Sequence, residues 1–335
     1  TGAAANVTWD KSEDDLIFND NAKAAFGTSS DLSIYHNGTH SYINDSGTGS
    51  LIILADDFYI QDTSTNSMIQ CIEGAQVQLH YSGNKKLETT NTGITITGIL
   101  VAEGGIDATD AQSNTRVGYG AGDSFTGTDA NANTLIGKNA GTAITTGDYN
   151  NVLGSGALDA TTTGNANIAV GTNALGNNTT ASNNVAIGTG ALEANTTGAD
   201  NVAVGYVALD ANTTGADNTA LGSGALGANT TASANTAVGY LAITANSTGA
   251  SNTAVGRQAL ASNTTASNIT AVGDQALYSN TTGPYNNAVG HHALTSNTTG
   301  GRNNAFGNFA LDANTTGGYN TAIGHEALTA NTTAS

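Results

Sequence analysis

The strongest constraint on the fold is an internal repeat of 17 residues. Glycines recur at this interval without a slip from Gly154 to Gly324; Gly137 lies one step upstream, and Gly118 lies 19 residues before Gly137. The unit reads N-[T/V/N]-A-[V/I/L/F]-G-x-x-A-[L/I]-x-[A/S]-N-T-T-[G/A]-x-x, as in residues 201–217. Such a unit is too short for the two helices of common helical repeats, but it has room for two short strands and two turns. The repeat therefore predicts an all-β fold in which each unit is one coil of a parallel β-solenoid.

Two positions of the unit, counted from its first Asn, are predicted to form apolar ladders inside the solenoid. Position 9 is Leu or Ile in every unit after Gly141, and position 4 is always apolar. Equivalent residues of stacked coils lie above one another, so each position would form a continuous core ladder. The predicted ladder at position 4 comprises Val204, Leu221, Val238, Val255, Val272, Val289, Phe306 and Ile323.

The corners of the coil are predicted from the remaining fixed residues. Position 5 is always Gly, which indicates a corner with positive φ or a close approach of two backbones. The N-T-T-[G/A] segment can form Asx and hydroxyl turns at a second corner, where Ala replaces Gly in some units. The corner glycines are Gly205, Gly222, Gly239, Gly256, Gly273, Gly290, Gly307 and Gly324.

Alanine at positions 3 and 8 bears on assembly. Neighbouring residues of a strand face opposite ways, so an Ala beside each core residue is expected on the outside. Uniform Ala there favours a tight contact with other copies of the same chain, which would stabilise a thin solenoid. The alternative is that the invariant Ala marks a narrow interior.

Residues 1–112 have a different pattern, with short alternating runs separated by turn signals such as Asn37-Gly38 and Gly83-Asn84. We predict β-hairpin modules here, a transition with irregular first repeats over 113–149, and the solenoid over 150–335. The predicted strands are Leu16–Phe18, Leu32–Tyr35, Ser50–Ala55, Phe58–Ile60, Met68–Cys71, Val77–Tyr81 and Ile94–Leu100.

Charge and composition exclude several classes. Only 10% of residues are charged while 38% are hydrophobic, which argues against disorder. Eight Lys and Arg against 26 Asp and Glu argue against nucleic acid or an anionic membrane as a partner. Cys71 is alone and forms no disulfide within the chain, and no apolar run is long enough for a membrane helix. No capping sequence follows the last coil, so we expect the natural chain to continue beyond Ser335.

Two sets of residues resemble known families. The blocks Asn184–Leu192, Asn252–Leu260 and Asn320–Leu328 resemble the head repeats of trimeric autotransporter adhesins, although this family has a shorter repeat. That resemblance implies a parallel β-roll of three chains around one axis. Ser30–Asp45 and Gly93–Gly98 resemble the shaft of bacteriophage tail fibres, especially those of marine phages. That resemblance implies a homotrimer, in the virion, that carries host recognition at its distal end.

Candidate catalytic and metal-binding residues are few. Asp56, Asp57 and Asp62 could supply the carboxylates of a polysaccharide hydrolase, but neighbouring acids on a strand point apart. His291 and His325 lie two coils apart, about 9.6 Å, too far to share an ion within one chain. We therefore expect no catalytic residue, cofactor or metal, and interpret His291, His292 and His325 as surface residues.

The Asn-Thr-Thr segments allow three interpretations. They form N-x-[S/T] acceptor sites that could carry sugars, they could form a ladder of turns, or their Thr arrays could bind ice. The acceptor sites are Asn195, Asn212, Asn229, Asn246, Asn263, Asn280, Asn297 and Asn314. A turn ladder explains the residues most simply, because the Thr pair lies in a predicted corner and not on a flat strand.

The expected function is mechanical. We expect a homotrimeric shaft that projects an end that binds a host receptor or polysaccharide, located on a virion or at a cell surface. The alternative is an adhesin or extracellular filament subunit of a microbe.

Overall fold

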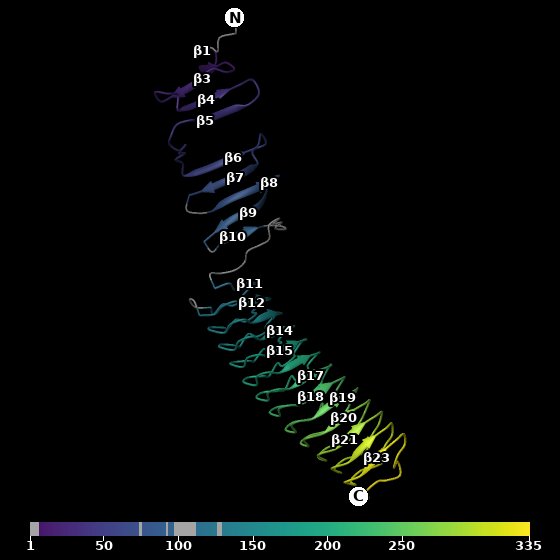
Figure 1. The fold of residues 1–335 in the computed structure, drawn as a ribbon. Helices are drawn as coiled ribbons and strands as arrows, with labels where there is room; N and C mark the ends of the chain where they lie inside the picture. The colour runs from purple at the N-terminus through teal and green to yellow at the C-terminus, as the bar shows by residue number, and fades with distance from the viewer. Residues whose placement is uncertain (1–6, 74–75, 92, 97–111, 126–128) are drawn as a thin grey trace. The chain divides into compact units, whose positions relative to one another are not determined.

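A computed structural model describes residues 7–73, 76–91, 93–96, 112–125 and 129–335 (Figure 1). The described residues form strands and turns without a helix, so the predicted all-β class is confirmed. No helix in this part of the chain could cross a membrane.

The first part consists of three small antiparallel sheets. A hairpin is followed by a three-stranded meander in the order β3-β4-β5 and a five-stranded meander in the order β6-β7-β8-β9-β10. The strands are β1 (Val7–Asp10), β2 (Asp15–Phe18), β3 (Lys23–Phe26), β4 (Leu32–His36), β5 (Ser41–Asp45), β6 (Asp57–Gln61), β7 (Ser67–Ile72), β8 (Val77–Tyr81), β9 (Asn84–Thr90) and β10 (Gly93–Ile96).

The predicted hairpin modules are thus present, with differences in detail. Residues 50–55 do not form the predicted strand, although they are apolar, because no neighbouring strand pairs with them. The strands β1, β3, β5 and β9 were not predicted, since their sequences are short and polar or carry Ala and Lys. Residues 97–100 of the last predicted strand lie outside the described residues.

The second part is a solenoid whose thirteen strands form one parallel sheet. Each strand pairs in register with the equivalent residues of the next coil, so Ala203 lies beside Ala220 and Val204 beside Leu221. The strands are β11 (Thr115–Val117), β12 (Thr134–Ile136), β13 (Asn151–Leu153), β14 (Ile168–Val170), β15 (Val185–Ile187), β16 (Val202–Val204), β17 (Thr219–Leu221), β18 (Thr236–Val238), β19 (Thr253–Val255), β20 (Thr270–Val272), β21 (Asn287–Val289), β22 (Asn304–Phe306) and β23 (Thr321–Ile323).

Each coil contains one three-residue strand and not the two strands that we predicted. The rest of the coil consists of turns, yet it still bonds to the next coil through its backbone. The N–H of Leu209 donates to the carbonyl oxygen of Ala225 at 2.9 Å, and that of Thr213 donates to Thr230 at 2.8 Å. Tight turns satisfy the backbone here as a second strand would.

The core is built from positions 3, 8 and 9. Ala203, Ala208 and Leu209 are fully buried, as are their equivalents in most coils. The predicted ladder at position 9 is confirmed. Leu209 and most of its equivalents have positive φ, which costs a residue with a Cβ about 1–2 kcal/mol. Complete burial of a Leu side chain contributes about 1.5–3 kcal/mol and offsets that cost.

The predicted core ladder at position 4 is wrong. Leu221, Phe306 and Ile323 are exposed, and the others are exposed or half-buried. Alternation along a three-residue strand directs only its middle side chain inward, and that residue is the Ala of position 3. The residues concerned are Val204, Leu221, Val238, Val255, Val272, Val289, Phe306 and Ile323.

The prediction that the Ala residues face outward is wrong for the same reason, and the narrow interior is the correct alternative. The Leu side chain at position 9 fills the space between the Ala side chains at positions 3 and 8. The coil that begins at Asn133 reverses this arrangement, because it has Leu135 at position 3 and Gly141 at position 9. A Cβ on Gly141 would lie 2.9 Å from Leu135 Cδ2, so the interior accommodates one large side chain across these two positions.

Two ladders of buried Asn hold the second corner. Asn201 Nδ2 and Asn212 Nδ2 each donate to the carbonyl oxygen of Gly215 at 2.9 Å. Asn212 Nδ2 also donates to Asn195 Oδ1 in the preceding coil at 2.9 Å. All eight Asn residues of the predicted acceptor sites are fully buried. A sugar on Nδ2 would remove one of its two N–H donors and needs space that these buried side chains lack, so the folded coil supports the turn-ladder interpretation.

All the predicted corner glycines have positive φ, and all but Gly324 of the last coil also lie close to the backbone of the next coil. Gly205 has φ +144°, and a Cβ there would lie 2.5 Å from the carbonyl oxygen of Gly222 in the next coil. Real Cβ atoms essentially never approach a backbone atom so closely.

We predict that Gly205→Ala lowers the stability of the solenoid by about 1–3 kcal/mol or more, because strain and steric conflict add. Gly227→Ala is the matched control, since a Cβ there has its nearest neighbour at 3.4 Å and Ala261 occupies the equivalent position. Thermal unfolding followed by circular dichroism measures both. Equal effects of the two substitutions would contradict the proposed role of Gly205.

Candidate functional site

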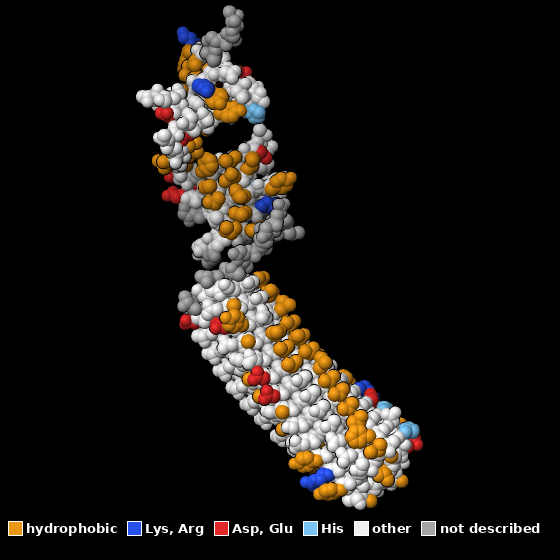
Figure 2. Space-filling model, in the orientation of Figure 1, with side chains coloured by type: hydrophobic (Ala, Val, Ile, Leu, Met, Phe, Trp, Pro, Cys, Tyr) orange, Lys and Arg blue, Asp and Glu red, His pale blue; other side chains and the backbone are white. Residues whose placement is uncertain are grey.

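The main surface feature of the solenoid is an apolar stripe formed by position 4. Figure 2 shows apolar side chains in a line along the solenoid, and Leu153, Ile187, Leu221 and Phe306 are among its most exposed members. The stripe, as defined here, comprises Val117, Ile136, Leu153, Val170, Ile187, Val204, Leu221, Val238, Val255, Val272, Val289, Phe306 and Ile323. No polar side chain interrupts it along β11–β23, which is unusual for a surface in contact with water.

Position 2 forms a second ladder on the same face of the sheet. In four successive coils it is Thr219, Thr236, Thr253 and Thr270, and other coils have Thr, Val, Ile or Asn there. Positions 2 and 4 both point outward because one residue separates them on the strand. The outer face of the sheet therefore carries β-branched side chains beside the stripe in most coils, and Asn in the coils of β13, β21 and β22.

The first part of the chain exposes apolar side chains on single-layer sheets. Among its described residues only Ala22, Ser33 and Gln78 are buried, whereas Trp9 and Ile43 are more than half exposed. A shallow hollow beside the five-stranded sheet is lined by Phe58, Cys71 and other residues. Sheets of this kind need a second layer for stability.

Two of the three carboxylates considered for catalysis, Asp57 and Asp62, accept hydrogen bonds from nearby backbone groups. Asp62 accepts bonds from the N–H groups of Ser64 at 2.8 Å and Asn66 at 2.9 Å, so it closes the turn between β6 and β7. The hydrogen bond from the Asn66 side chain, with that of its backbone, holds the pKa of Asp62 below its ordinary value. Asp57 accepts a bond from the Glu73 N–H at 3.2 Å. Asp56 lines the hollow beside the five-stranded sheet together with Glu73, whose N–H also donates to the Asp56 carbonyl oxygen at 3.0 Å.

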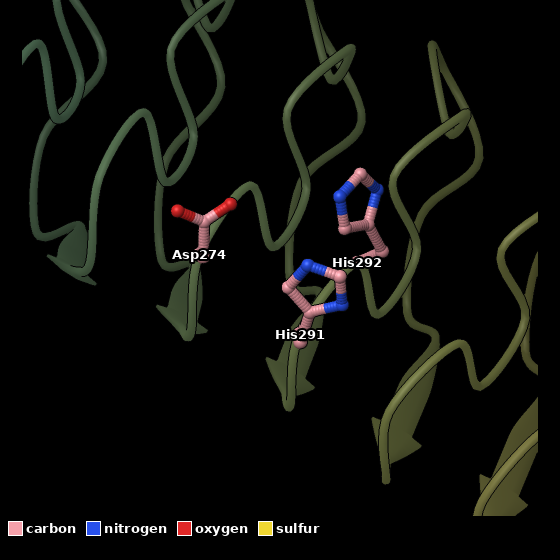
Figure 3. A group of neighbouring side chains, drawn as sticks. All are labelled: Asp274, His291 and His292. Carbon is pink, nitrogen blue, oxygen red and sulfur yellow. The ribbon is translucent and has the colours of Figure 1, made fainter.

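The histidine-containing corner brings together residues that the sequence did not group. Asp274 at position 6 lies one coil before His291, and His292 follows at position 7. Their ligand atoms all lie within 4.8 Å of one another (Figure 3). His325 stays apart, with the Phe309 ring between it and His291. The sequence contained a signal for this group, since residues 17 apart lie side by side in the solenoid.

Four acids occupy position 10 and are partly buried: Asp159, Glu193, Asp210 and Asp312. Burial raises the pKa of Asp159 and that of Asp210, against backbone hydrogen bonds that act in the opposite direction. The nearby Glu193 charge adds to the rise at Asp210. Asp159 and Asp210 lie three coils apart. A pKa that differs between the folded and the unfolded chain makes stability depend on pH.

No protein-family model matches the chain, and comparisons with curated proteins and with solved structures find no similar protein. The interpretation of the stripe therefore depends on its own geometry.

We predict that Asp210→Asn raises the melting temperature at pH 7. A carboxyl whose pKa is higher in the folded state contributes stability below its unfolded pKa, and loses that contribution as pH rises through the folded pKa. The gain of the variant should therefore shrink as pH falls below about 4.

Asp217→Asn serves as the matched control for this measurement, because Asp217 is exposed at position 17 of the same coil. Melting curves at pH 7 and at a pH below about 4 test the prediction. A gain at Asp210 that does not depend on pH would contradict the assignment.

Proposed function

We propose that this chain is the shaft of a homotrimeric fibre that holds a receptor-binding end away from the particle or cell that carries it. Its role is mechanical and not catalytic. The observation that supports the proposal best is the uninterrupted apolar stripe along β11–β23.

The spacing of side chains along the stripe indicates which kind of surface could cover it. Apolar side chains repeat once per coil, at the spacing of about 4.8 Å between neighbouring strands. A surface that matches this spacing over thirteen strands must have the same repeat, and the simplest such surface is another copy of this chain. The single-layer sheets of the first part need a covering layer as well, and the same copies could supply it.

The number of copies and the biological setting come from the resemblances. Both the adhesin-head repeats and the tail-fibre shafts that this sequence resembles are trimers. The resemblance of residues 30–45 favours a phage tail fibre that takes part in host attachment. A microbial adhesin or extracellular filament subunit is the alternative, with the same trimeric shaft.

We predict a mass of three times 33.3 kDa by light scattering on the native chain, with resistance to dissociation on heating. Val255→Lys with Val272→Lys should lower the mass or the dissociation temperature, because six ammonium groups would be buried without partners. Thr265→Lys with Thr282→Lys is the control, since these Thr residues are exposed at position 14. A monomeric wild-type chain would overturn the trimer.

A monomer would favour a second candidate function, ice binding. The outer face would then be a flat array with four Thr in successive coils beside the stripe, and not the corner Thr pairs considered from the sequence. The corner residue Thr213 donates its hydroxyl hydrogen to Thr230 at 3.0 Å, so it is less available for ice. Inhibition of ice recrystallisation would test this candidate.

The biological setting is tested by location. Antibodies against the purified chain should label thin fibres on phage particles in electron micrographs of the source material. Labelling of cell surfaces instead would support the adhesin. Labelling confined to the cell interior would contradict both settings.

A further inference from the structure

The corner formed by Asp274, His291 and His292 carries a separate inference, which does not depend on the oligomeric state. Asp274 occupies position 6 of one coil, and the two His residues occupy positions 6 and 7 of the next coil. The His292 N–H donates to the Asp274 carbonyl oxygen at 3.0 Å, which fixes the two corners against each other. The three side chains therefore come from backbones held in register.

The local backbone explains why two adjacent His side chains converge. Neighbouring residues of an extended strand point apart, but His292 has φ +55° and follows the Gly290 corner. The two imidazole rings lie 4.1 Å apart between centroids. Phe309 of the following coil contacts both rings, stacking on His292 at 5.6 Å. A neighbouring aromatic side chain thus limits the positions of both rings.

The carboxylate is held as well. Arg257 of the preceding coil donates to both oxygens of Asp274, at 2.8 Å from Nε and 3.0 Å from an Nη. A carboxylate has about four lone-pair sites, so a bidentate Arg leaves acceptor capacity for a further bond. Such an outer partner orients a ligand, as second partners commonly do in metal sites.

We propose that Asp274, His291 and His292 bind a divalent transition cation of the zinc class, which links two neighbouring coils. Two imidazoles and one carboxylate are the donors preferred by Zn²⁺ and Co²⁺, and three protein ligands leave one position open. Ligand atoms within 4.8 Å of one another can all lie within about 2.8 Å of a central ion. Bonds of about 2.0–2.1 Å then need inward shifts of less than about 1 Å, which partly exposed side chains can make.

This grouping differs from the other His residues of the solenoid. His325 has one acidic neighbour, Glu326, at 3.4 Å, and both side chains are largely exposed. Among the described residues, Asp274, His291 and His292 are the only set of three His, Cys, Asp or Glu side chains that lie close enough together to hold one metal ion. His325 is therefore a matched control for an ordinary surface histidine at position 6.

The test uses the full chain without an affinity tag, stripped of metal with a chelator. Co²⁺ is titrated and followed by its visible absorption, Zn²⁺ is then added to displace it, and melting curves are recorded with and without Zn²⁺. The variants are His291→Ser, His292→Gln and Asp274→Asn, with His325→Ser as the control. Ser223 occupies position 6 and Gln275 position 7 in other coils, so the chain already accommodates these side chains.

We expect one saturable ion per chain and a rise in melting temperature with Zn²⁺, because an ion that binds only the folded coils stabilises them. His291→Ser and His292→Gln should each weaken binding at least about tenfold and remove the rise. Asp274→Asn should weaken it too, while His325→Ser should leave it unchanged. Each variant should melt like the wild type in the chelator, which shows that it folds.

Two results would overturn the proposal. One is the absence of saturable binding at millimolar Co²⁺ or Zn²⁺. The other is binding that His325→Ser reduces as much as His291→Ser does, which would show a dispersed affinity of surface histidines.

Discussion

The structure depends on the strict register between neighbouring coils. Each residue of a coil bonds and packs against the residue 17 positions away, so every position becomes a ladder of like side chains. Two buried Asn ladders help to maintain this register; Asn212, for example, donates both to its own corner and to the preceding coil. A single insertion within a coil would displace every ladder at once, and the only irregular spacing in the repeats lies at their start, before Gly137.

The repeat period predicted the solenoid, the corner glycines and the Leu209 ladder. Each follows from the 17-residue spacing together with the residue type, since an invariant Gly indicates a corner and an invariant Leu or Ile indicates the core. The side of the sheet on which Val204 lies could not be predicted in the same way. Successive side chains of a strand point to opposite faces, so Ala203 and Val204 must face apart. This alternation does not determine which of the two faces the core. Apolarity suggested Val204, whereas most coils bury Ala at position 3, and the coil with Leu135 at that position has Gly141 opposite it, where a Cβ would clash with Leu135.

The Asp274 group was missed for a different reason. Contacts in a solenoid join residues one coil apart, so side chains at i, i+17 and i+18 meet although they are distant in sequence. Asp274 and His291 both occupy position 6, in neighbouring coils, and equivalent positions of neighbouring coils lie side by side. The positive φ that turns His292 toward them is not visible in the sequence, since position 7 holds residues as different as Val207, Gln258 and Phe309.

The strict register also determines which side chains are left on the surface of the solenoid. A core of Ala and one Leu per coil makes a thin solenoid, and the larger apolar residue of each strand is then left on the outside. The same constraint that fixes the core therefore produces a continuous apolar face that repeats at the spacing of neighbouring strands. A fold that leaves much of its apolar surface outside is stable where that surface is covered, so in the trimer proposed above folding and assembly would be coupled.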